Sequence, residues 1–353
     1  MELKKTVILN QISKYRTFDI LGPFEKRITA IAWHPVYSQF AVSGSNRGEL
    51  SLYNINRSTS EISPSINIKG SVLGLKFSSN DPSVVFVASF SGGLRQQDFS
   101  GQTTTIFTKV KWGWFNSLDV SYRKTLILAG DSSGRGHLLT TQGFKIWRSK
   151  DYMHHGSITH VEFNTRDENV FATASDDKFV KLWDMRMVAN IGTKLKPVHV
   201  FPHLEPVNSA CFSPSNGLSL LTTDQHSQLH IYSGPCWQEH LIIQHPHRQY
   251  EHLTPVKAAW HPIEDIIIVG RYPDENFLSA DRRTIDFYDG NSGELLYRKN
   301  SPTENIISLN AFNITGECLA LGSSCNVVFM KDENTIKGSS AVHKQDSQLL
   351  ATK

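Results

Sequence analysis

Apolar and polar residues alternate in a short sequence segment, here called a phrase, of which the chain holds seven copies. Each copy ends on a large apolar residue, and successive copies lie 43 to 52 residues apart. Alternation of this kind predicts a strand with one buried face, and a recurring period of this size indicates a repeat architecture. The seven phrases are Ile28–Trp33, Val72–Phe77, Phe115–Val120, Ile158–Phe163, Val207–Phe212, Val256–Trp260 and Ile307–Phe312.

A second strand pattern, a turn rich in Gly, Asp or Asn, and a third strand pattern follow each phrase. Such units of about 45 residues are typical of the WD repeat, and Thr173–Asp184 in the fourth unit is a near-complete match. We therefore predict an all-β fold, a seven-bladed WD-repeat β-propeller with two loop-covered faces. The third patterns are Glu49–Tyr53, Gly93–Asp98, Gly136–Leu139, Phe179–Asp184, Gln228–Tyr232, Thr284–Asp289 and Asn326–Phe329.

Three regions follow from this pattern. The propeller is expected over residues 23–331. Residues 1–22 form an N-terminal extension, with a short helix before Ser13 and a strand over Tyr15–Leu21 that closes the ring in the last blade; the extension is also expected to contact a partner. Residues 332–353 are polar, and we expect a disordered tail.

Composition narrows the class of protein. The 353 residues are 39% hydrophobic and carry a net charge of +3, which is globular and does not by itself indicate nucleic acid. The four cysteines form no CxxC pair, so reduced thiols in an intracellular protein are expected, with no metal or cofactor. Neither a signal peptide nor an apolar run of about 18 residues is present, so no membrane partner is expected.

The chain lacks the motifs of common catalytic sites. It contains no GxGxxG before a helix, no P-loop, no HExxH and no GxSxG elbow. The Gly/Ser clusters at Ser132–Arg135 and Gly322–Ser324, and the pair Asp176 and Asp177, are interpreted as turns between strands. We therefore expect a binding platform with no catalytic residues, and not an enzyme.

Two insertions interrupt the repeat. The first, Gln244–Pro255, holds three histidines, an arginine and a tyrosine, and prolines stand near both of its ends, at Pro246 and Pro255. A stiff loop with an aromatic tip suits insertion between stacked bases, although a loop of this length can equally pack on its own blade. The second, Gly270–Arg283, brings three arginines that either bind phosphate or pair with neighbouring acidic side chains.

Trp112 and Trp114 precede the third phrase. At a junction between a loop and a strand, an indole ring can line the mouth of a pocket. Packing in the core is the usual alternative for tryptophan.

From about residue 14 to residue 330, the chain resembles the small, DNA-contacting subunit of the UV-damaged-DNA-binding complex. The most specific motif of this resemblance is His245–Pro262, which is far more informative than a Trp-Asp dipeptide. The other segments that carry it are Pro23–Pro35, Leu221–Gln225, Val269–Asp274, Arg283–Asp286 and Ile307–Asn310.

The resemblance implies a nuclear sensor of UV photolesions in chromatin that acts in nucleotide excision repair. One face of the disc would bind damaged double-stranded DNA. The other would bind the large adaptor subunit of the complex, which links the propeller to a cullin-four RING ubiquitin ligase, with histones as further partners. A three-residue wedge would enter the minor groove and extrude the damaged dinucleotide. A lesion is poorly paired and weakly stacked, so extruding it costs less than flipping a normal base.

By position, the resemblance assigns DNA-binding residues to loops of one face and adaptor-binding residues to the end of the fourth repeat. The wedge is Tyr250, Glu251 and His252, preceded by Arg248 and Gln249; the phosphate contacts are Lys26, Arg47 and Arg283; the lesion pocket is bordered by Trp114; and the adaptor contacts are Asp184 and Arg186.

The chain departs from the family pattern at several of these positions. The family wedge has phenylalanine and glutamine where this chain has Tyr250 and Glu251, and a carboxylate there repels phosphate. A basic run before the fourth blade is here His154–Ser157, and a lysine of the first blade is Asn46, beside which Arg47 can substitute. The N-terminal segment that grips the adaptor is short. A second hypothesis is therefore a WD-repeat scaffold or substrate receptor for proteins, with weakened or lost DNA binding.

Overall fold

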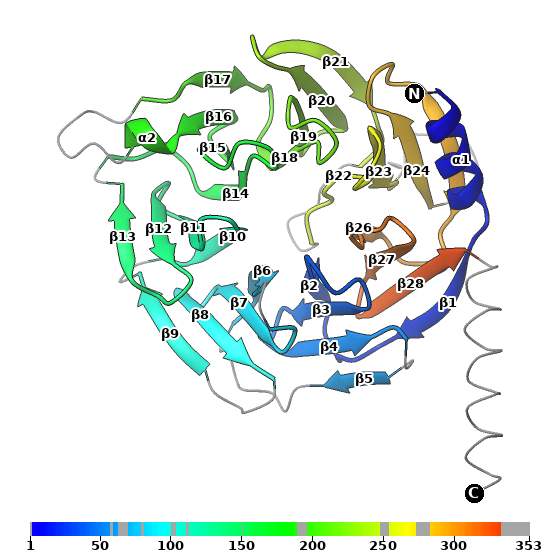
Figure 1. The fold of residues 1–353 in the computed structure, drawn as a ribbon, viewed down its shortest axis with the longest axis horizontal. Helices are drawn as coiled ribbons and strands as arrows, with labels where there is room; N and C mark the ends of the chain where they lie inside the picture. The colour runs from blue at the N-terminus through cyan, green and yellow to red at the C-terminus, as the bar shows by residue number, and fades with distance from the viewer. Residues whose placement is uncertain are drawn as a thin grey trace, which may run out of the picture.

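The computed structural model describes residues 2–56, 59–62, 70–78, 81–99, 104–110, 113–149, 151–188, 196–247, 254–272 and 283–332. Within these residues the strands form seven antiparallel sheets of four strands, arranged as blades around a central channel (Figure 1). The predicted all-β, seven-bladed β-propeller is confirmed. Of the expected tail, residues 332–353, Asp332 is the last residue of a strand, and residues 333–353 lie outside the described residues; the other domain boundaries drawn from the sequence stay a prediction.

The first strand of each repeat lies nearest the channel, and the following strands succeed one another outward. Blade one consists of β2 (Ile28–Trp33), β3 (Phe40–Ser45), β4 (Leu50–Asn54) and β5 (Thr59–Ile62). Blade two consists of β6 (Val72–Phe77), β7 (Val84–Ser89), β8 (Gly93–Asp98) and β9 (Thr104–Lys109). Blade three consists of β10 (Phe115–Ser121), β11 (Leu126–Asp131), β12 (Gly136–Thr140) and β13 (Lys145–Arg148).

The remaining blades repeat this plan. Blade four consists of β14 (Ile158–Phe163), β15 (Val170–Ser175), β16 (Phe179–Asp184) and β17 (His199–Pro202). Blade five consists of β18 (Val207–Phe212), β19 (Ser219–Asp224), β20 (Gln228–Ser233) and β21 (Gln238–Gln244). Blade six consists of β22 (Ala259–Trp260), β23 (Ile266–Gly270), β24 (Thr284–Asp289) and β25 (Leu295–Asn300). Blade seven consists of β26 (Ile307–Phe312), β27 (Cys318–Ser323), β28 (Asn326–Asp332) and β1 (Tyr15–Leu21).

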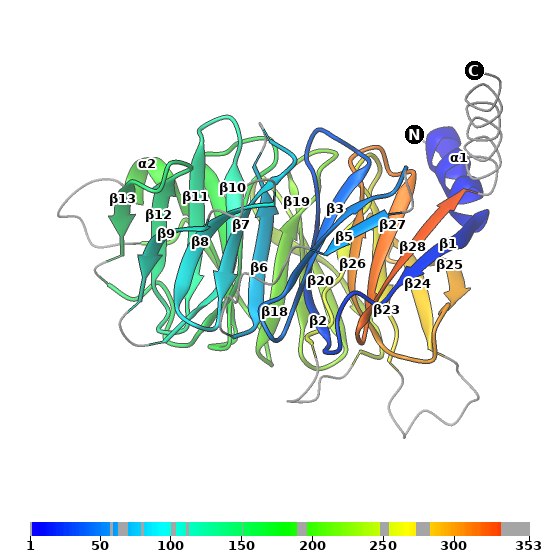
Figure 2. The same ribbon diagram turned by 90° about the horizontal axis from the view of Figure 1, so that it is seen from below.

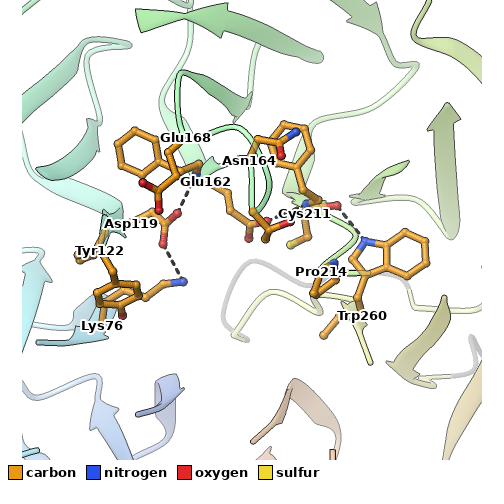
Figure 3. Close-up of a pocket in the computed structure, with 14 residues that line it drawn as sticks. Lys76, Asp119, Tyr122, Glu162, Asn164, Glu168, Cys211, Pro214 and Trp260 are labelled. Carbon is orange, nitrogen blue, oxygen red and sulfur yellow. Dashed lines mark hydrogen bonds and ion pairs between the residues drawn. The ribbon is translucent and has the colours of Figure 1, made fainter. Parts of the chain in front are cut away.

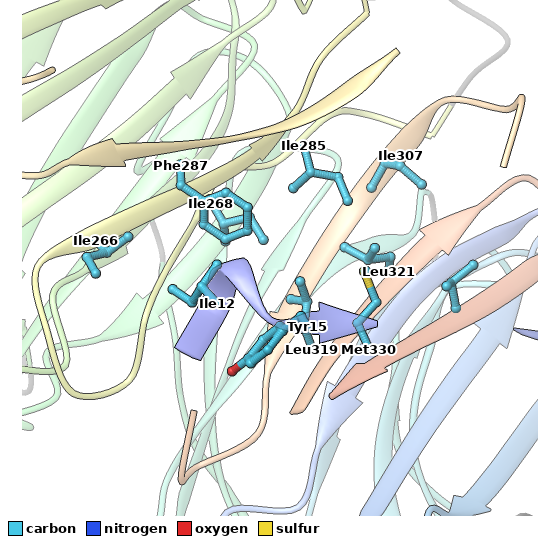
Figure 4. Packing of buried hydrophobic residues seen from close by; sticks show 11 residues of the cluster. Ile12, Tyr15, Ile266, Ile268, Ile285, Phe287, Ile307, Leu319, Leu321 and Met330 are labelled. Carbon is cyan, nitrogen blue, oxygen red and sulfur yellow. The ribbon is translucent and has the colours of Figure 1, made fainter. Parts of the chain in front are cut away.

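Blade seven closes the ring with a strand from the start of the chain, as the sequence predicts. Strand β1 pairs antiparallel with β28, and helix α1 (Glu2–Ser13) precedes it. Ile12 and Tyr15 are buried in one apolar cluster with residues of blades six and seven, such as Phe287 and Met330 (Figure 4). The Tyr15 hydroxyl donates to the carbonyl of Gly316. The N-terminal extension is therefore packed into the ring.

Every strand of a blade runs antiparallel to the next, so the disc has two distinct faces. We call the face where the innermost strands begin the entry face; it also carries the turns between second and third strands, such as residues 46–49. The opposite face, the exit face, carries the turns between first and second strands, such as residues 34–39. Helices α1 and α2 (Met185–Val188) both lie on the exit-face side of the disc (Figure 2). Among the described residues, no helix is long and apolar enough to cross a membrane.

The first strand of blade six is shorter than predicted. The alternating phrase predicts Val256–Trp260, but β22 covers Ala259–Trp260 alone. The Lys257 N–H donates to the carbonyl of Ser308 in blade seven, and the Ala258 N–H donates to the Thr223 hydroxyl in blade five. The segment therefore bridges its neighbouring blades before it joins its own sheet.

A buried chain of hydrogen bonds holds the fourth blade together. The Trp183 indole donates to the Thr173 hydroxyl over 2.8 Å, and that hydroxyl lies 2.7 Å from Nε2 of His154. Nδ1 of His154 lies 3.0 Å from the Asp177 carboxylate. His154, which the sequence places where the family has basic residues, is buried, and burial lowers the pKa of its imidazole. It therefore supports the blade as a neutral side chain and supplies no surface charge.

Changing Asp177 to asparagine is expected to remove a pH-dependent part of the stability. Burial alone would raise the pKa of Asp177, but hydrogen bonds from His154 and from the N–H groups of His155 and Phe179 lower it to about 2. An unfolded aspartate has a pKa of about 3.9, so the ionised form contributes about 2 kcal/mol above that pH, and this is lost as pH falls towards 2.

Urea unfolding at a series of pH values measures this contribution. The free energy of unfolding of the unchanged protein should exceed that of Asp177→Asn by a constant amount above about pH 5, and the gap should narrow between about pH 4 and pH 2. A gap that stays constant through this window would contradict the assignment.

Candidate nucleic-acid interface

The central channel opens on the entry face into a cavity of about 510 Å³. Residues at the starts of the innermost strands line it, together with turns between second and third strands. Arg27 and Lys257 are basic members of this lining, and Trp114 is its aromatic member. The entry face therefore offers an opening lined by basic and aromatic groups, with Asp176 as an acidic member.

Trp114 forms a stacked pair of rings with Phe90. The ring centroids are 4.4 Å apart with 30° between the planes, and Phe90 is 51% exposed. The indole N–H of Trp114 donates to Asn116 over 2.6 Å, which fixes the ring. Sequence reasoning named Trp114 and missed Phe90, although an aromatic residue within a Ser/Gly turn was a usable signal.

The predicted phosphate contacts of blade one lie together on the entry face. Lys26 and Arg47 are exposed, and the two segments are joined by the hydrogen bond from the Asn46 N–H to the carbonyl of Arg27. Arg47 pairs with Glu25 at 3.3 Å, with 55% and 84% of the two side chains exposed. An ion pair this exposed contributes little and opens readily, so Arg47 can exchange Glu25 for another anion.

Arg283 lies on the same face in blade six, at the start of β24. Its guanidinium lies 5.6 Å from the ring centroid of Tyr272 and donates to the carbonyl of Glu304. Arg283 therefore lies in a different blade from Trp114, and one of its N–H groups already has a hydrogen-bond partner within the chain.

The predicted wedge, Tyr250–His252, and the two residues before it, Arg248 and Gln249, lie outside the described residues, but the residues on either side of this segment are described. On the N-terminal side His245 and His247 are buried, with their Nδ1 atoms 3.0 Å apart, and Nε2 of His247 lies 3.0 Å from the carbonyl of Asp224. On the C-terminal side the Thr254 hydroxyl donates to the carbonyl of Ile28 over 2.8 Å. Two of the three histidines in this insertion therefore anchor the loop and are not free to contact DNA.

A buried carboxylate lies beneath the N-terminal anchor. Asp286 is 0% exposed, and both of its oxygens accept hydrogen bonds from Arg298, at 3.0 and 3.1 Å. Nη1 of Arg271 and Nε2 of His245 each lie 3.8 Å from the same carboxylate. Arg271 is 6% exposed and faces Asp286, which lies outside the insertion, so it is a buried arginine and not one of the solvated surface arginines expected from the sequence. Arg282 lies outside the described residues.

The adaptor-binding candidates lie on the exit face, at the end of β16. Arg186 donates from Nε and Nη2 to the carboxylate of Asp184, and 67% of its side chain is exposed. These hydrogen bonds from Arg186 lower the pKa of Asp184. The guanidinium is therefore held in a fixed orientation at the surface.

Exposed apolar side chains gather on the exit face. Five lie in turns between first and second strands, one in α2 and one in the turn between β12 and β13. Together they give the exit face apolar surface that a protein partner can bury. These residues are Val36, Tyr37, Leu218, Ile263, Ile314, Met187 and Phe144.

The channel interior holds a cluster of ionisable side chains (Figure 3). Lys76 pairs with Asp119 at 2.9 Å, and burial together with Asp119 raises the pKa of Glu162 to about 8. The ligand atoms of His160, Glu162 and Cys211 lie within 4.8 Å of one another. Burial lowers the pKa of His160, and the positive charges of Lys257 and Lys76 lower it further. These charges oppose a divalent cation, so we interpret the cluster as an internal charge balance.

Comparison with known proteins identifies the family. The WD domain, G-beta repeat, matches residues 148–184, which span blade four as far as the end of β16. The chain is 39% identical over 334 residues to DNA damage-binding protein 2 of Danio rerio, covering 93% of this chain and 66% of the relative. It is 41% identical over 320 residues to the protein of the same name from Bos taurus, covering 88% and 74%. A relative of that name from Oryza sativa is 27% identical over 330 residues, covering 87% and 55%.

The chain thus spans about two thirds of the length of its Danio rerio relative. The family resemblance read from the sequence is confirmed by identities of this size over most of the chain. The chain belongs to the DNA damage-binding protein 2 family.

Proposed function

We propose that this chain recognises UV-damaged double-stranded DNA on its entry face and binds a protein adaptor on its exit face. In this proposal it acts in the nucleus, at chromatin, as the substrate receptor of a cullin-four RING ubiquitin ligase in nucleotide excision repair. The name of its relatives, DNA damage-binding protein 2, supports damage binding. The observation that carries the proposal is that His247 and Thr254, which flank the predicted wedge, are held by hydrogen bonds beside an opening lined by Trp114.

The entry face suits a mechanism in which damaged DNA is recognised because it is easier to deform than undamaged DNA. Because both flanking residues are already held in place, inserting the wedge into the duplex should cost less conformational entropy than inserting an unanchored segment. The stacked rings of Phe90 and Trp114 offer an apolar surface at the opening where an extruded base can stack. Lys26 and Arg47 lie on the same face and supply positive charge for the phosphates.

A mobility-shift comparison tests the DNA half of this proposal. The purified full chain is titrated against irradiated duplex and against the same duplex without irradiation, at physiological salt. We expect tighter binding to the irradiated duplex, because a weakly stacked lesion costs less to extrude. Equal binding to the two duplexes would overturn damage recognition.

The exit face suits a protein partner. It carries the seven exposed apolar side chains named above, the fixed guanidinium of Arg186 and helix α1. Burial of apolar surface drives most protein association, and a guanidinium held by its own carboxylate is oriented for a partner at low entropic cost. The adaptor is the partner that the family resemblance suggests for this face.

Changing Arg186 to alanine is expected to weaken adaptor binding without altering DNA binding. Removal of an oriented arginine from an interface typically costs 2 kcal/mol or more at a central position, or about 30-fold in affinity. Arg123→Ala, which removes an exposed arginine of blade three on the same face, is the matched control. Co-purification with the large adaptor subunit measures the effect, and equal retention of both variants would contradict the assignment.

A second candidate is a scaffold or substrate receptor for proteins whose DNA face has lost its function. The internal contacts of Arg47 with Glu25 and of Arg283 with Glu304 support it, because both arginines already have partners. The carboxylate of Glu251 in the loop supports it as well. This candidate predicts adaptor binding that depends on Arg186 together with equal, weak binding of both duplexes.

A further inference from the structure

A basic and aromatic corner of blade three lies on the entry face beside the cavity. Its first component is a pair of side chains far apart in the repeat, Arg135 in the turn between β11 and β12 and Tyr152 after β13. The guanidinium of Arg135 lies 4.4 Å from the centroid of the Tyr152 ring, and Tyr152 is 58% exposed. A guanidinium over a ring at this distance is held by a cation–π contact.

The backbone builds this corner. The carbonyl of Gly134 accepts the N–H groups of Met153 at 2.9 Å and His154 at 3.2 Å. Gly134 has a positive φ of 83°, and a Cβ at this position would overlap the His154 carbonyl, so the close approach requires glycine. The turn and the connection to blade four are therefore fixed against each other.

The same contacts bring a second arginine to the corner. The N–H of Ser149 donates to the carbonyl of Gly136 over 2.9 Å. Arg148, the residue before Ser149, is exposed and pairs with His137 in the strand register. We call Arg135, Arg148 and Tyr152 the blade-three corner.

The two positive charges of the corner are not neutralised locally. Within the part of the chain that the structure describes, no carboxylate forms an ion pair with Arg135 or Arg148. Of the acidic groups nearby, Asp131 is bonded to His137 at 2.8 Å and Asp177 to His154 at 3.0 Å, and the exposed Asp151 directly precedes Tyr152. Two arginines against the single carboxylate of Asp151 leave the corner with a net positive charge at the surface.

The corner also adjoins the proposed DNA site. Ser132, in the same turn as Arg135, donates its N–H to the carbonyl of Trp114 over 2.8 Å, and its hydroxyl accepts the Trp114 N–H at 3.1 Å. Ser132 and Trp114 both line the entry-face cavity. A duplex centred on that cavity would pass its backbone over one side of the rim, where the corner lies.

We propose that the blade-three corner binds backbone phosphates of the DNA next to the lesion. This proposal rests on the proposed function and adds a binding site to it. Arg135 and Arg148 supply the charge, and the Tyr152 ring holds the Arg135 guanidinium in one plane, so that its planar fork of N–H donors meets phosphate oxygens. Because phosphates carry no sequence or damage information, the corner contributes affinity and not selectivity.

The test compares three forms of the full chain, the unchanged protein and two double variants, by fluorescence anisotropy with irradiated and undamaged duplex at several salt concentrations. Arg135→Gln with Arg148→Gln removes the two charges. Arg123→Gln with Lys145→Gln removes two exposed charges from the exit face of the same blade and is the matched control. The double corner variant should bind both duplexes more weakly, on the order of 5- to 25-fold at 0.15 M salt, with the slope of log K against log salt reduced by about 1 to 2.

The ratio of affinities for the two duplexes should not change in the corner variant, and the control should behave as the unchanged protein. Binding and slope that match the unchanged protein, or an equal loss in the control, would overturn the proposal. A loss confined to the irradiated duplex would also overturn it. If the unchanged protein binds both duplexes equally, damage recognition fails, while a uniform loss in the corner variant would still support the corner.

Tyr152 provides a second variant with its own readout. Tyr152→Phe keeps the ring and should leave both affinities unchanged. Tyr152→Ala removes the contact that orients Arg135 and should weaken binding of both duplexes by about 2- to 5-fold. Equal behaviour of these two variants would contradict the orienting role of the ring.

Discussion

Replacing Tyr250 and His252 together with alanine is expected to abolish the preference of this protein for irradiated DNA. Both belong to the wedge loop, whose ends are fixed by His247 and Thr254. Stacking of an aromatic side chain on a base contributes on the order of 1–3 kcal/mol, so the loss of two rings lowers affinity for irradiated duplex by at least about 30-fold. Affinity for undamaged duplex should change little, because it comes from phosphate contacts.

Competition between the two duplexes for the same protein measures this preference. Glu251→Gln keeps both rings and changes the residue between them, which makes it the matched control; it should retain the preference. The wedge assignment would be wrong if the double variant still favoured irradiated duplex, or if it lost affinity for both duplexes in equal proportion. The second pattern would instead indicate an electrostatic role for the loop.

Replacing Asp286 with alanine is expected to lower the free energy of unfolding by about 3–5 kcal/mol, because it removes the buried carboxylate that forms ion pairs with Arg271 and Arg298. Asp286 is fully buried and accepts two hydrogen bonds from Arg298, with Arg271 and His245 also facing it. Since His245 belongs to the anchor of the wedge loop, the same change should loosen the base of that loop.

Chemical denaturation measures the loss of stability, and Asp289→Ala provides the comparison. Asp289 lies at the end of the same strand, β24, but its ion pair with Lys5 is at the periphery, with 16% of the Asp289 side chain and 19% of the Lys5 side chain exposed. We expect a loss of about 1 kcal/mol there, as is usual for ion pairs that water can reach. Equal losses for the two variants would show that Asp286 does not hold the network together.

The sequence was sufficient to predict the architecture because the alternation of apolar and polar residues is present in every repeat. Phrases with period two recur at the innermost strand of every blade, and the ring-closing strand Tyr15–Leu21 follows from the need to complete blade seven. The prediction was wrong for the length of the first strand of blade six. There the N–H of Lys257 bonds to blade seven, and hydrogen bonds between blades have no signature in local alternation.

The site was predicted less completely, because several of its features depend on contacts between distant residues. The resemblance placed Lys26, Arg47, Trp114 and Arg283 on loops, and the repeat topology puts all four on the entry face. The Ser132–Arg135 cluster was interpreted as a turn, which it is, but its neighbour Tyr152 belongs to another segment. Their contact comes from the packing of that turn against the connection to blade four.

The histidines show the same limit. From the sequence alone, histidines in loops are candidates for contact with DNA, because an imidazole can form hydrogen bonds with it. Burial decides otherwise for His154, His245 and His247, which bond to Asp177, to each other and to the carbonyl of Asp224. Burial lowers the pKa of all three imidazoles, so they support the structure as neutral side chains.

The assignment of DNA to one face of the disc is the central claim, and hydrogen–deuterium exchange tests it most directly. The full chain is compared with and without irradiated duplex. Slower exchange is expected on the entry face, at residues 24–29, 113–116, 132–136 and 245–254, with unchanged exchange in the exit-face turns at residues 34–39, 261–265 and 313–317. Protection of the exit-face turns, with no change on the entry face, would contradict the account.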